Sequence, residues 1–211
     1  STAQPNVNTI MEIIRKHAVI DNETELYSEL LTSLIPNANP SHEIHKENSI
    51  RLTQMTSPQI IQLNLKCSSW QEAIRLSGQC MVAEHKVTQD YVDAIIRINL
   101  NSAPYLVITK AVALPHARPE LGALQRAIGI ATLADPVAFG NQENDPVKYV
   151  FFLSALDNES HLCAMSELLE LLNTVDFFVM LDHAASPEAV YDYIKKFEMA
   201  YFKQDGYLGI S

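Results

Sequence analysis

Two segments near the start of the chain have the apolar spacing of helices. Apolar residues recur every three or four positions over residues 7–18 and again over residues 26–34, which is the spacing of one helix face. Pro36 and Pro40 follow in a turn-rich stretch, and proline blocks the continuation of a helix. The pattern predicts a helical pair followed by a linker near residues 36–48.

The pattern changes to alternation at residue 61. Polar residues at 62, 64 and 66 alternate with apolar ones, which predicts a half-buried strand. The residues expected on its inward face are Ile61, Leu63 and Leu65. Further apolar runs, partly β-branched, are typical of sheet strands. They span residues 105–109, 111–114, 128–133 and 149–153.

Helix signals lie between and after these strands. Ser69 stands three residues before Glu72, the spacing of a capping box, and Thr88 is expected to cap the next helix. Residues 157–160 are typical of a helix N-terminus, and Ser186 with Pro187 predicts the start of a final helix.

The alternation of strands and helices from about residue 58 to residue 200 predicts the fold class. We expect an α/β fold, a mixed β-sheet of about five strands flanked by helices on both faces, with an N-terminal helical extension. The predicted division is a helical extension and linker at 1–48, an α/β domain at 49–200 and a C-terminal tail at 201–211.

Charge and composition exclude several classes of function. The chain has 211 residues and a net charge of −10, from 15 Lys plus Arg against 25 Asp plus Glu. The basic residues are scattered, which argues against direct nucleic-acid binding. No apolar run approaches the roughly 18 residues of a membrane span, and the first residues lack the shape of a signal peptide. We therefore expect a cytoplasmic protein without direct membrane insertion.

Neither a metal nor a cofactor is indicated. The cysteines form no Cys-x-x-Cys pair and are expected to be reduced core thiols. His42 and His45 have a spacing that a metal could use, but no third ligand lies nearby. No glycine-rich nucleotide-binding motif and no nucleophile elbow is present.

Two histidines have positions suited to chemistry. His116 follows an apolar strand that ends in Pro115, where a buried strand becomes a loop. His161 is expected in the first turn of the helix after residues 149–153, where unpaired backbone N–H groups favour an anion. A neutral imidazole can attack phosphorus, and Arg118 and His161 are suitable donors to a phosphorylated ring. The alternative is that either histidine is structural or simply solvent-exposed.

Several segments carry a resemblance to a known family. They are Ser69–Ile74, Ala103–Tyr105, Ala113–Glu120, Asn144–Val147 and Asp157–His161. With these segments the chain resembles the mannitol/fructose-type enzyme IIA proteins of the bacterial sugar phosphotransferase system (PTS), and most closely their ascorbate-like branch, over roughly residues 49–200.

The resemblance implies a function and a set of site residues. It implies that His116 accepts a phosphoryl group from the phosphocarrier protein HPr and passes it to a IIB domain, while His161 assists. Mannitol-type members place an arginine upstream of the tyrosine in the segment Ala103–Tyr105. Arg97 is one position off, so Arg118 is expected to be the charge partner. Docking partners are expected to meet an apolar surface formed by Leu114, Ala117 and Leu121.

The segment before the α/β domain leaves an alternative open. It resembles the segment preceding the enzyme IIA domain of BglG-type transcriptional regulators and antiterminators. The chain would then be a regulatory domain whose phosphorylation changes its contacts with neighbouring regulator domains.

Overall fold

The chain divides into two compact units, Ser1–Ile44 and His45–Ser211. A computed structural model describes residues 10, 11, 13, 14, 26, 30, 50–157 and 160–204. The six described residues of the first unit are all helical. The rest of the predicted helical pair and the predicted linker lie outside the described residues.

The second unit is built on a mixed sheet of five strands. The strands are β1 (Ile61–Leu65), β2 (Val107–Thr109), β3 (Val112–Ala113), β4 (Ala127–Val137) and β5 (Val147–Ser154). Their order is β1-β4-β5-β3-β2. β1 and β4 are parallel, as are β3 and β5, whereas β4 with β5 and β2 with β3 are antiparallel. The predicted fold class is therefore confirmed.

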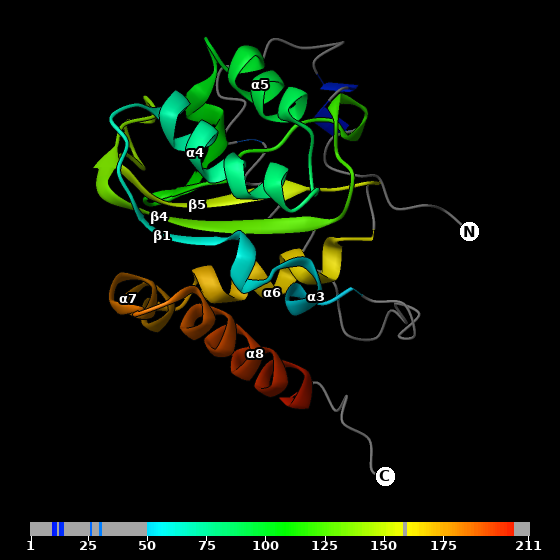
Figure 1. Cartoon of the computed structure of the whole chain (residues 1–211), viewed down its shortest axis with the longest axis vertical. Coiled ribbons are helices and arrows are strands. Elements are labelled where there is room, and N and C mark those ends of the chain that lie inside the picture. Colours follow the sequence, from blue (N-terminus) through cyan, green and yellow to red (C-terminus); the bar gives the residue numbers. More distant parts are fainter. Residues whose placement is uncertain are drawn as a thin grey trace. The chain divides into compact units, whose positions relative to one another are not determined.

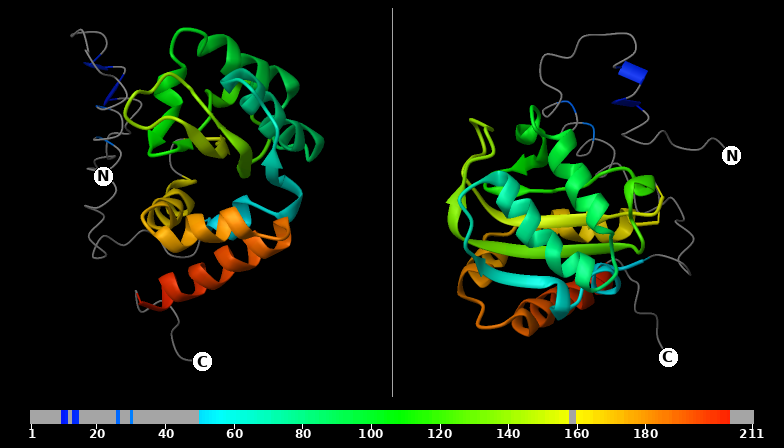
Figure 2. Two further views of the ribbon diagram at one scale, coloured as in Figure 1. Left: turned by 90° about the vertical axis from the view of Figure 1, so that its left-hand side faces the viewer. Right: turned by 45° about the horizontal axis from the view of Figure 1, so that its top comes forward.

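Helices cover both faces of this sheet. They are α3 (Leu52–Met55), α4 (Trp70–Ala83), α5 (Gln89–Ile98), α6 (Leu162–Leu172), α7 (Val175–His183) and α8 (Pro187–Gln204). In Figure 1, α4 and α5 lie on one side of the strands and α3, α6, α7 and α8 on the other, and the layers are also visible in Figure 2. Short 3₁₀ helices span Pro58–Ile60, Ala103–Leu106 and Pro119–Leu121.

Two hydrophobic clusters fill the spaces between sheet and helices. Phe151 belongs to the cluster beneath α6, α7 and α8, and Phe152 to the cluster beneath α4 and α5. Successive side chains of a strand point to opposite faces, so a central strand covered on both sides needs an uninterrupted apolar run. This explains the sequence of β5.

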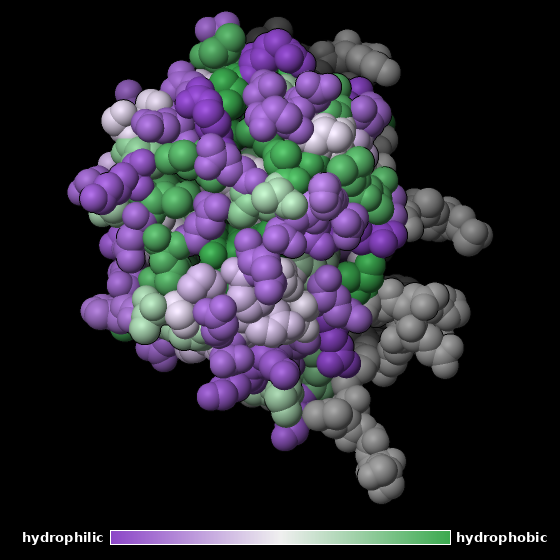
Figure 3. Space-filling view, viewed as in Figure 1, coloured by the Kyte–Doolittle hydropathy of each residue, from purple (hydrophilic) through white to green (hydrophobic). Residues whose placement is uncertain are grey.

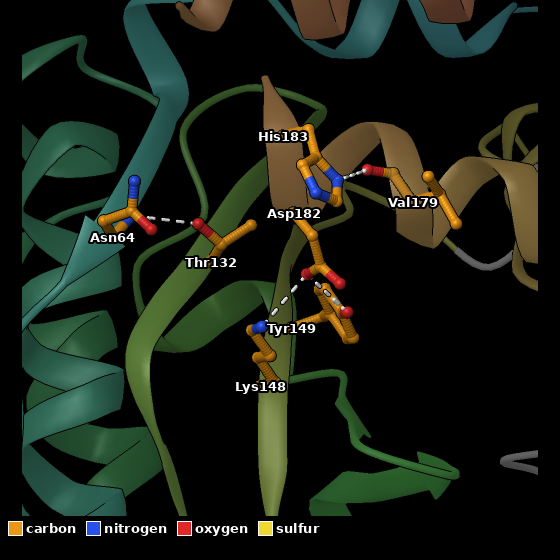
Figure 4. A network of polar contacts seen from close by, with 7 residues as sticks. All are labelled: Asn64, Thr132, Lys148, Tyr149, Val179, Asp182 and His183. Atoms are coloured by element: carbon orange, nitrogen blue, oxygen red, sulfur yellow. Dashed lines mark hydrogen bonds and ion pairs between the residues drawn. The ribbon is translucent and has the colours of Figure 1, made fainter. Parts of the chain in front are cut away.

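β1 contains a bulge that changes one prediction. Asn64 has a φ of 57°, and the register with β4 shifts between residues 62 and 65. The Asn64 N–H donates to Thr132 Oγ1 at 2.9 Å (Figure 4). As a result Leu63 packs on the α6–α8 side and Leu65 on the α4–α5 side. The prediction that they share a face was wrong, because the extra residue reverses the alternation.

The helix starts largely follow the sequence signals. Ser69 Oγ accepts from Glu72 N at 3.2 Å, while the Glu72 carboxylate accepts from Ser68 N instead of Ser69 N. Thr88 caps α5 through Tyr91 N. α8 begins at Pro187, as predicted, and continues to Gln204, so the first four residues of the predicted tail are helical.

The structure differs from the sequence-based prediction in two further elements. Residues 105 and 106 belong to a 3₁₀ helix, so the strand predicted there is shorter. α7 was not predicted. Its Asp182 joins it to β5, because Tyr149 Oη donates to Asp182 Oδ1 at 2.7 Å and Lys148 Nζ lies 3.1 Å from the same oxygen (Figure 4).

The surface of the described residues has an ordinary composition. On the face drawn in Figure 3, hydrophobic and hydrophilic residues are interspersed, as is usual for a folded domain. None of the helices among residues 50–157 and 160–204 has the length and apolar character needed to cross a membrane.

Candidate functional site

The loops that carry the candidate residues meet at one edge of the sheet. β4 begins at Ala127, which pairs with Ser154, the last residue of β5. β3 runs parallel to β5, so it ends at the same edge. The loop after β3, the segment before β4 and the loop after β5 carry His116, Arg126 and His161 respectively.

The ring of His116 is held in one tautomer. Its Nδ1 lies 2.7 Å from the carbonyl oxygen of Leu114. A carbonyl oxygen only accepts, so Nδ1 carries the proton and Nε2 the lone pair. Burial lowers the pKa of His116, and the bond to Leu114 offsets this in part. The imidazole is therefore neutral near pH 7, with its nucleophilic atom at Nε2.

The backbone on both sides of His116 is bonded to the end of β5. Leu153 N–H donates to the carbonyl oxygen of Pro115 at 2.9 Å. Ala117 N–H donates to Tyr91 Oη at 3.0 Å, and that hydroxyl donates to the carbonyl oxygen of Leu153 at 2.9 Å. Tyr91 is fully buried, and burial raises its pKa to about 12. Its hydroxyl therefore stays protonated and fixes the loop.

His161 is the N-cap residue of α6, one position before the helical turn in which it was expected. Its Nδ1 is buried, and among the described residues it has no hydrogen-bond partner. Burial is the main cause that lowers the pKa of His161; Asp157 raises it, and the neighbouring His116 and Arg126 lower it further. These electrostatic effects act over short distances. His116 therefore lies within electrostatic reach of His161.

Arg126 was not predicted from the sequence. Its Nε lies 2.5 Å from Ser160 Oγ, and its Nη2 lies 3.6 Å from Asp157 Oδ2. Asp157 Oδ1 in turn accepts from Ser160 N at 2.7 Å. No motif marks this arginine, and only the pairing of β4 with β5 places it beside the start of α6.

The two arginines considered from the sequence are both exposed. Arg118 stands immediately before the 3₁₀ helix Pro119–Leu121. It is not among the groups that shift the pKa of His116 or His161. Arg97 lies in the last turn of α5. The role of Arg118 stays a prediction.

Apolar side chains are exposed around this edge of the sheet. Leu124, Leu156 and Leu162 are 49%, 39% and 49% exposed. A hollow of about 340 Å³ is lined by Ile50, Gln54, Leu124, Gln125, Arg126 and Leu156. Leu114 is only 2% exposed, so its predicted contribution to a docking surface was wrong: its side chain belongs to the core. Ala117 and Leu121 are half-buried.

No metal site is evident in the described part of the chain. Within residues 50–157 and 160–204 no three His, Cys, Asp or Glu side chains lie together as metal ligands would. His42 and His45 lie outside the described residues. The three cysteines form no disulfide, and burial raises the pKa of Cys80 and Cys163 to about 11. Both are therefore thiols at neutral pH.

One family model matches most of the second unit of the chain. The sequence profile described as "Phosphoenolpyruvate-dependent sugar phosphotransferase system, EIIA 2" matches residues 54–197. The chain belongs to this family, the type 2 enzyme IIA proteins of the PTS.

Named relatives include mannitol-specific and ascorbate-specific components. The mannitol-specific cryptic phosphotransferase enzyme IIA component of Escherichia coli K12 is 34% identical over 148 residues, 70% of this chain and 99% of the relative. The ascorbate-specific PTS system EIIA component of Escherichia coli K12 is 29% identical over 137 residues, 64% of this chain and 89% of the relative.

Solved structures agree with the fold. The solution structure of the mannitol-specific cryptic enzyme IIA CmtB from Escherichia coli matches with a TM-score of 0.61 at 34% identity, over 70% of this chain and 99% of that one. The complex of enzyme IIA and phosphorylated enzyme IIB for mannitol from Escherichia coli matches with a TM-score of 0.57 at 22% identity, over 67% and 97%. The second likeness concerns the fold alone.

Proposed function

We propose that this protein is a phosphohistidine carrier: His116 accepts a phosphoryl group from HPr and passes it to a IIB domain. The observation that carries the proposal is the neutral His116 ring, whose tautomer leaves the lone pair on Nε2. His161 lies within electrostatic reach of His116, and its Nδ1 is buried. Membership of the phosphotransferase family supports the same reaction class.

The transfer exchanges one N–P bond for another. The Nε2 lone pair of His116 attacks phosphorus in line; the new N–P bond forms while the bond to the donor histidine breaks, and that electron pair returns to the donor nitrogen. His116 keeps its Nδ1 proton, and the bond to Leu114 stabilises positive charge on the ring. In this scheme the protein's own donors suffice, without a cofactor.

His161 and Arg118 assist through charge and hydrogen bonding. The transferred group carries about two negative charges. His161 Nδ1, when it bears the ring proton, donates to a phosphoryl oxygen. Arg118 contributes a positive charge from the exposed side of the loop. Such preorganised donors are the main source of catalysis in reactions of this kind.

The partner surface consists of the exposed leucines together with the half-buried Ala117 and Leu121. Leu156 and Leu162 flank the segment that ends in His161, and Leu124 precedes Arg126 by two residues. Apolar groups around a polar centre are typical of an interface core.

The regulatory function remains the second candidate. The family match begins only at residue 54, so a preceding segment could respond to phosphorylation. A carrier must hand the group to a IIB domain, whereas a regulatory domain need only hold it. Incubation of the phosphorylated chain with IIB domains of the mannitol and ascorbate systems distinguishes them: loss of the label to a IIB domain identifies a carrier.

The first experiment is phosphorylation by phosphoenolpyruvate, enzyme I and HPr, read by intact mass. We expect one acid-labile phosphoryl group on the native chain, none on His116→Ala and slower addition on His161→Ala. His183→Ala is the matched control, because His183 is exposed and its Nδ1 also bonds to a carbonyl oxygen, that of Val179. A native chain that acquires no phosphoryl group refutes the proposal.

The docking surface is tested separately. Leu162→Asp and Ala117→Asp place a charge beside the site and are expected to raise the KM for HPr about tenfold or more, as loss of a central interface contact does. Val175→Asp makes the same kind of change at a 77% exposed position on α7 and should leave KM unchanged. Equal KM values for all three variants would place the surface elsewhere.

A further inference from the structure

The start of α6 holds a second arginine at the site. Arg126 Nε is anchored on Ser160 Oγ at 2.5 Å, and Nη2 lies 3.6 Å from Asp157 Oδ2. A guanidinium has five N–H donors in a fixed fork. These two contacts use two of the five, and the second is long for an ion pair with direct hydrogen bonding. The anchor fixes the position of the fork while leaving donors for another group.

The charge of Arg126 acts on the site. It lowers the pKa of His161, as the neighbouring His116 does, and Asp157 raises that pKa. Arg126 therefore lies within electrostatic reach of His161, whose pKa is also affected by His116.

We propose that Arg126 is a catalytic residue of the transfer, a second cationic partner that binds the phosphoryl group on His116. The inference rests on the proposed function. A phosphoryl group with about two negative charges competes with the single charge of Asp157 for the guanidinium. On transfer, the Nη end of Arg126 exchanges the long contact with Asp157 for the phosphoryl oxygens, while Nε stays on Ser160. This adds a positive charge beside the start of α6, in addition to the charge of Arg118.

A purely structural role makes a different prediction. If Arg126 only ordered the segment 157–161, breaking the ion pair from either side would have the same effect. If Arg126 binds the phosphoryl group, the two sides differ. Arg126→Gln removes a stabilising charge, whereas Asp157→Asn removes a competing carboxylate and keeps an oxygen that can accept from Ser160 N.

The experiment compares rates of phosphorylation by HPr for the native chain, Arg126→Gln, Arg126→Lys and Asp157→Asn. We expect Arg126→Gln to be slower by about tenfold or more, Arg126→Lys to recover part of the rate, and Asp157→Asn to be at least as fast as the native chain. Arg75→Gln, an exposed change on α4, is the matched control.

The outcomes separate this inference from the proposed function. A native chain that is not phosphorylated refutes both. Native-like transfer by Arg126→Gln, or an Asp157→Asn variant as slow as Arg126→Gln, refutes the role of Arg126 alone. Histidine NMR of the unphosphorylated variants shows whether they are folded, and the pKa of His161 should rise in Arg126→Gln.

Discussion

Glu167 lies beside Glu198 in the core, and the titration of Glu167 should make the stability of the fold depend on pH. Glu167 on α6 is fully buried and Glu198 on α8 is 5% exposed. Glu167 Oε1 accepts from Leu52 N at 3.1 Å, while Glu198 accepts from Thr53 N at 3.1 Å and from Thr53 Oγ1 at 2.7 Å. The pair therefore joins α3 to the two longer helices.

The remaining oxygen of Glu167 indicates where a proton resides. Oε2 is buried and accepts no hydrogen bond from any described residue, so as a carboxylate it would be unsatisfied. Burial, and then the hydrogen bond with Glu198, raise the pKa of Glu167 to about 9. We infer that Glu167 is protonated at neutral pH and donates to Glu198.

The sign of the effect follows from proton linkage. Between the ordinary Glu pKa of about 4.3 and the raised value, the folded chain keeps a proton that the unfolded chain has lost. Unfolding then releases a proton, so stability falls by at most about 1.4 kcal/mol per pH unit as pH rises. From pH 5.5 to 7.5 this amounts to about 2 to 3 kcal/mol.

Glu167→Gln should remove this dependence. The amide is neutral at every pH, accepts from Leu52 N through its oxygen and donates to Glu198 through its nitrogen. Urea unfolding at pH 5.5, 6.5 and 7.5 should show the variant gaining about 2 to 3 kcal/mol relative to the native chain over this range. Glu170→Gln, an exposed change on the same helix, should run parallel to the native chain. If Glu167→Gln also ran parallel, the reasoning would be refuted.

Three further predictions concern the loop of His116. Tyr91→Phe removes the hydroxyl that bonds to Ala117 N and to the Leu153 carbonyl oxygen. The free energy of unfolding measured in urea should fall by about 2 kcal/mol, and phosphorylation should be slower. Tyr105→Phe, at a 42% exposed position, should change neither quantity. Gly122→Ala should lower the free energy of unfolding by about 2 kcal/mol or more, because Gly122 has a φ of 136° and a Cβ there would overlap Thr88 Oγ1. A variant as stable as the native chain would contradict this prediction. With separately prepared phosphorylated HPr in excess, the transfer rate should be constant from pH 8 to 7 and fall only below about pH 6.5. The reason is that burial lowers the pKa of His116, so the ring stays neutral above that pH. A decrease in rate between pH 8 and 7 would count against a neutral nucleophile.

Local signals in the sequence predicted the elements that depend on local physics. The uninterrupted apolar run of β5 and the caps of α4 and α5 needed no knowledge of the rest of the chain. α7 was missed because its apolar residues, Phe177 to Leu181, are consecutive and show no helical period. The bulge at Asn64 was missed because it depends on pairing with Thr132, which lies far away in the sequence.

The candidate site divides in the same way. His116 and His161 stand at boundaries between strand, loop and helix that the sequence pattern marks. Arg126 precedes a strand without any signal of its own, and its neighbours Asp157 and Ser160 come from another loop. In the sequence Tyr91 resembles an ordinary core residue. Only the structure shows that its hydroxyl accepts a hydrogen bond from the N–H of Ala117, the residue after His116.

Because β3 pairs with β5 over only two residues, phosphorylation of the chain would indicate whether these strands pair in the native register. β3 has two residues, which pair with Tyr149 and Val150. A slip by one residue would displace the strand by about 3.3 Å and turn its side chains to the opposite face. Such a chain would retain most of its helices and strands yet separate His116 from His161. Acceptance of a phosphoryl group would therefore distinguish native from misregistered molecules that circular dichroism would score alike.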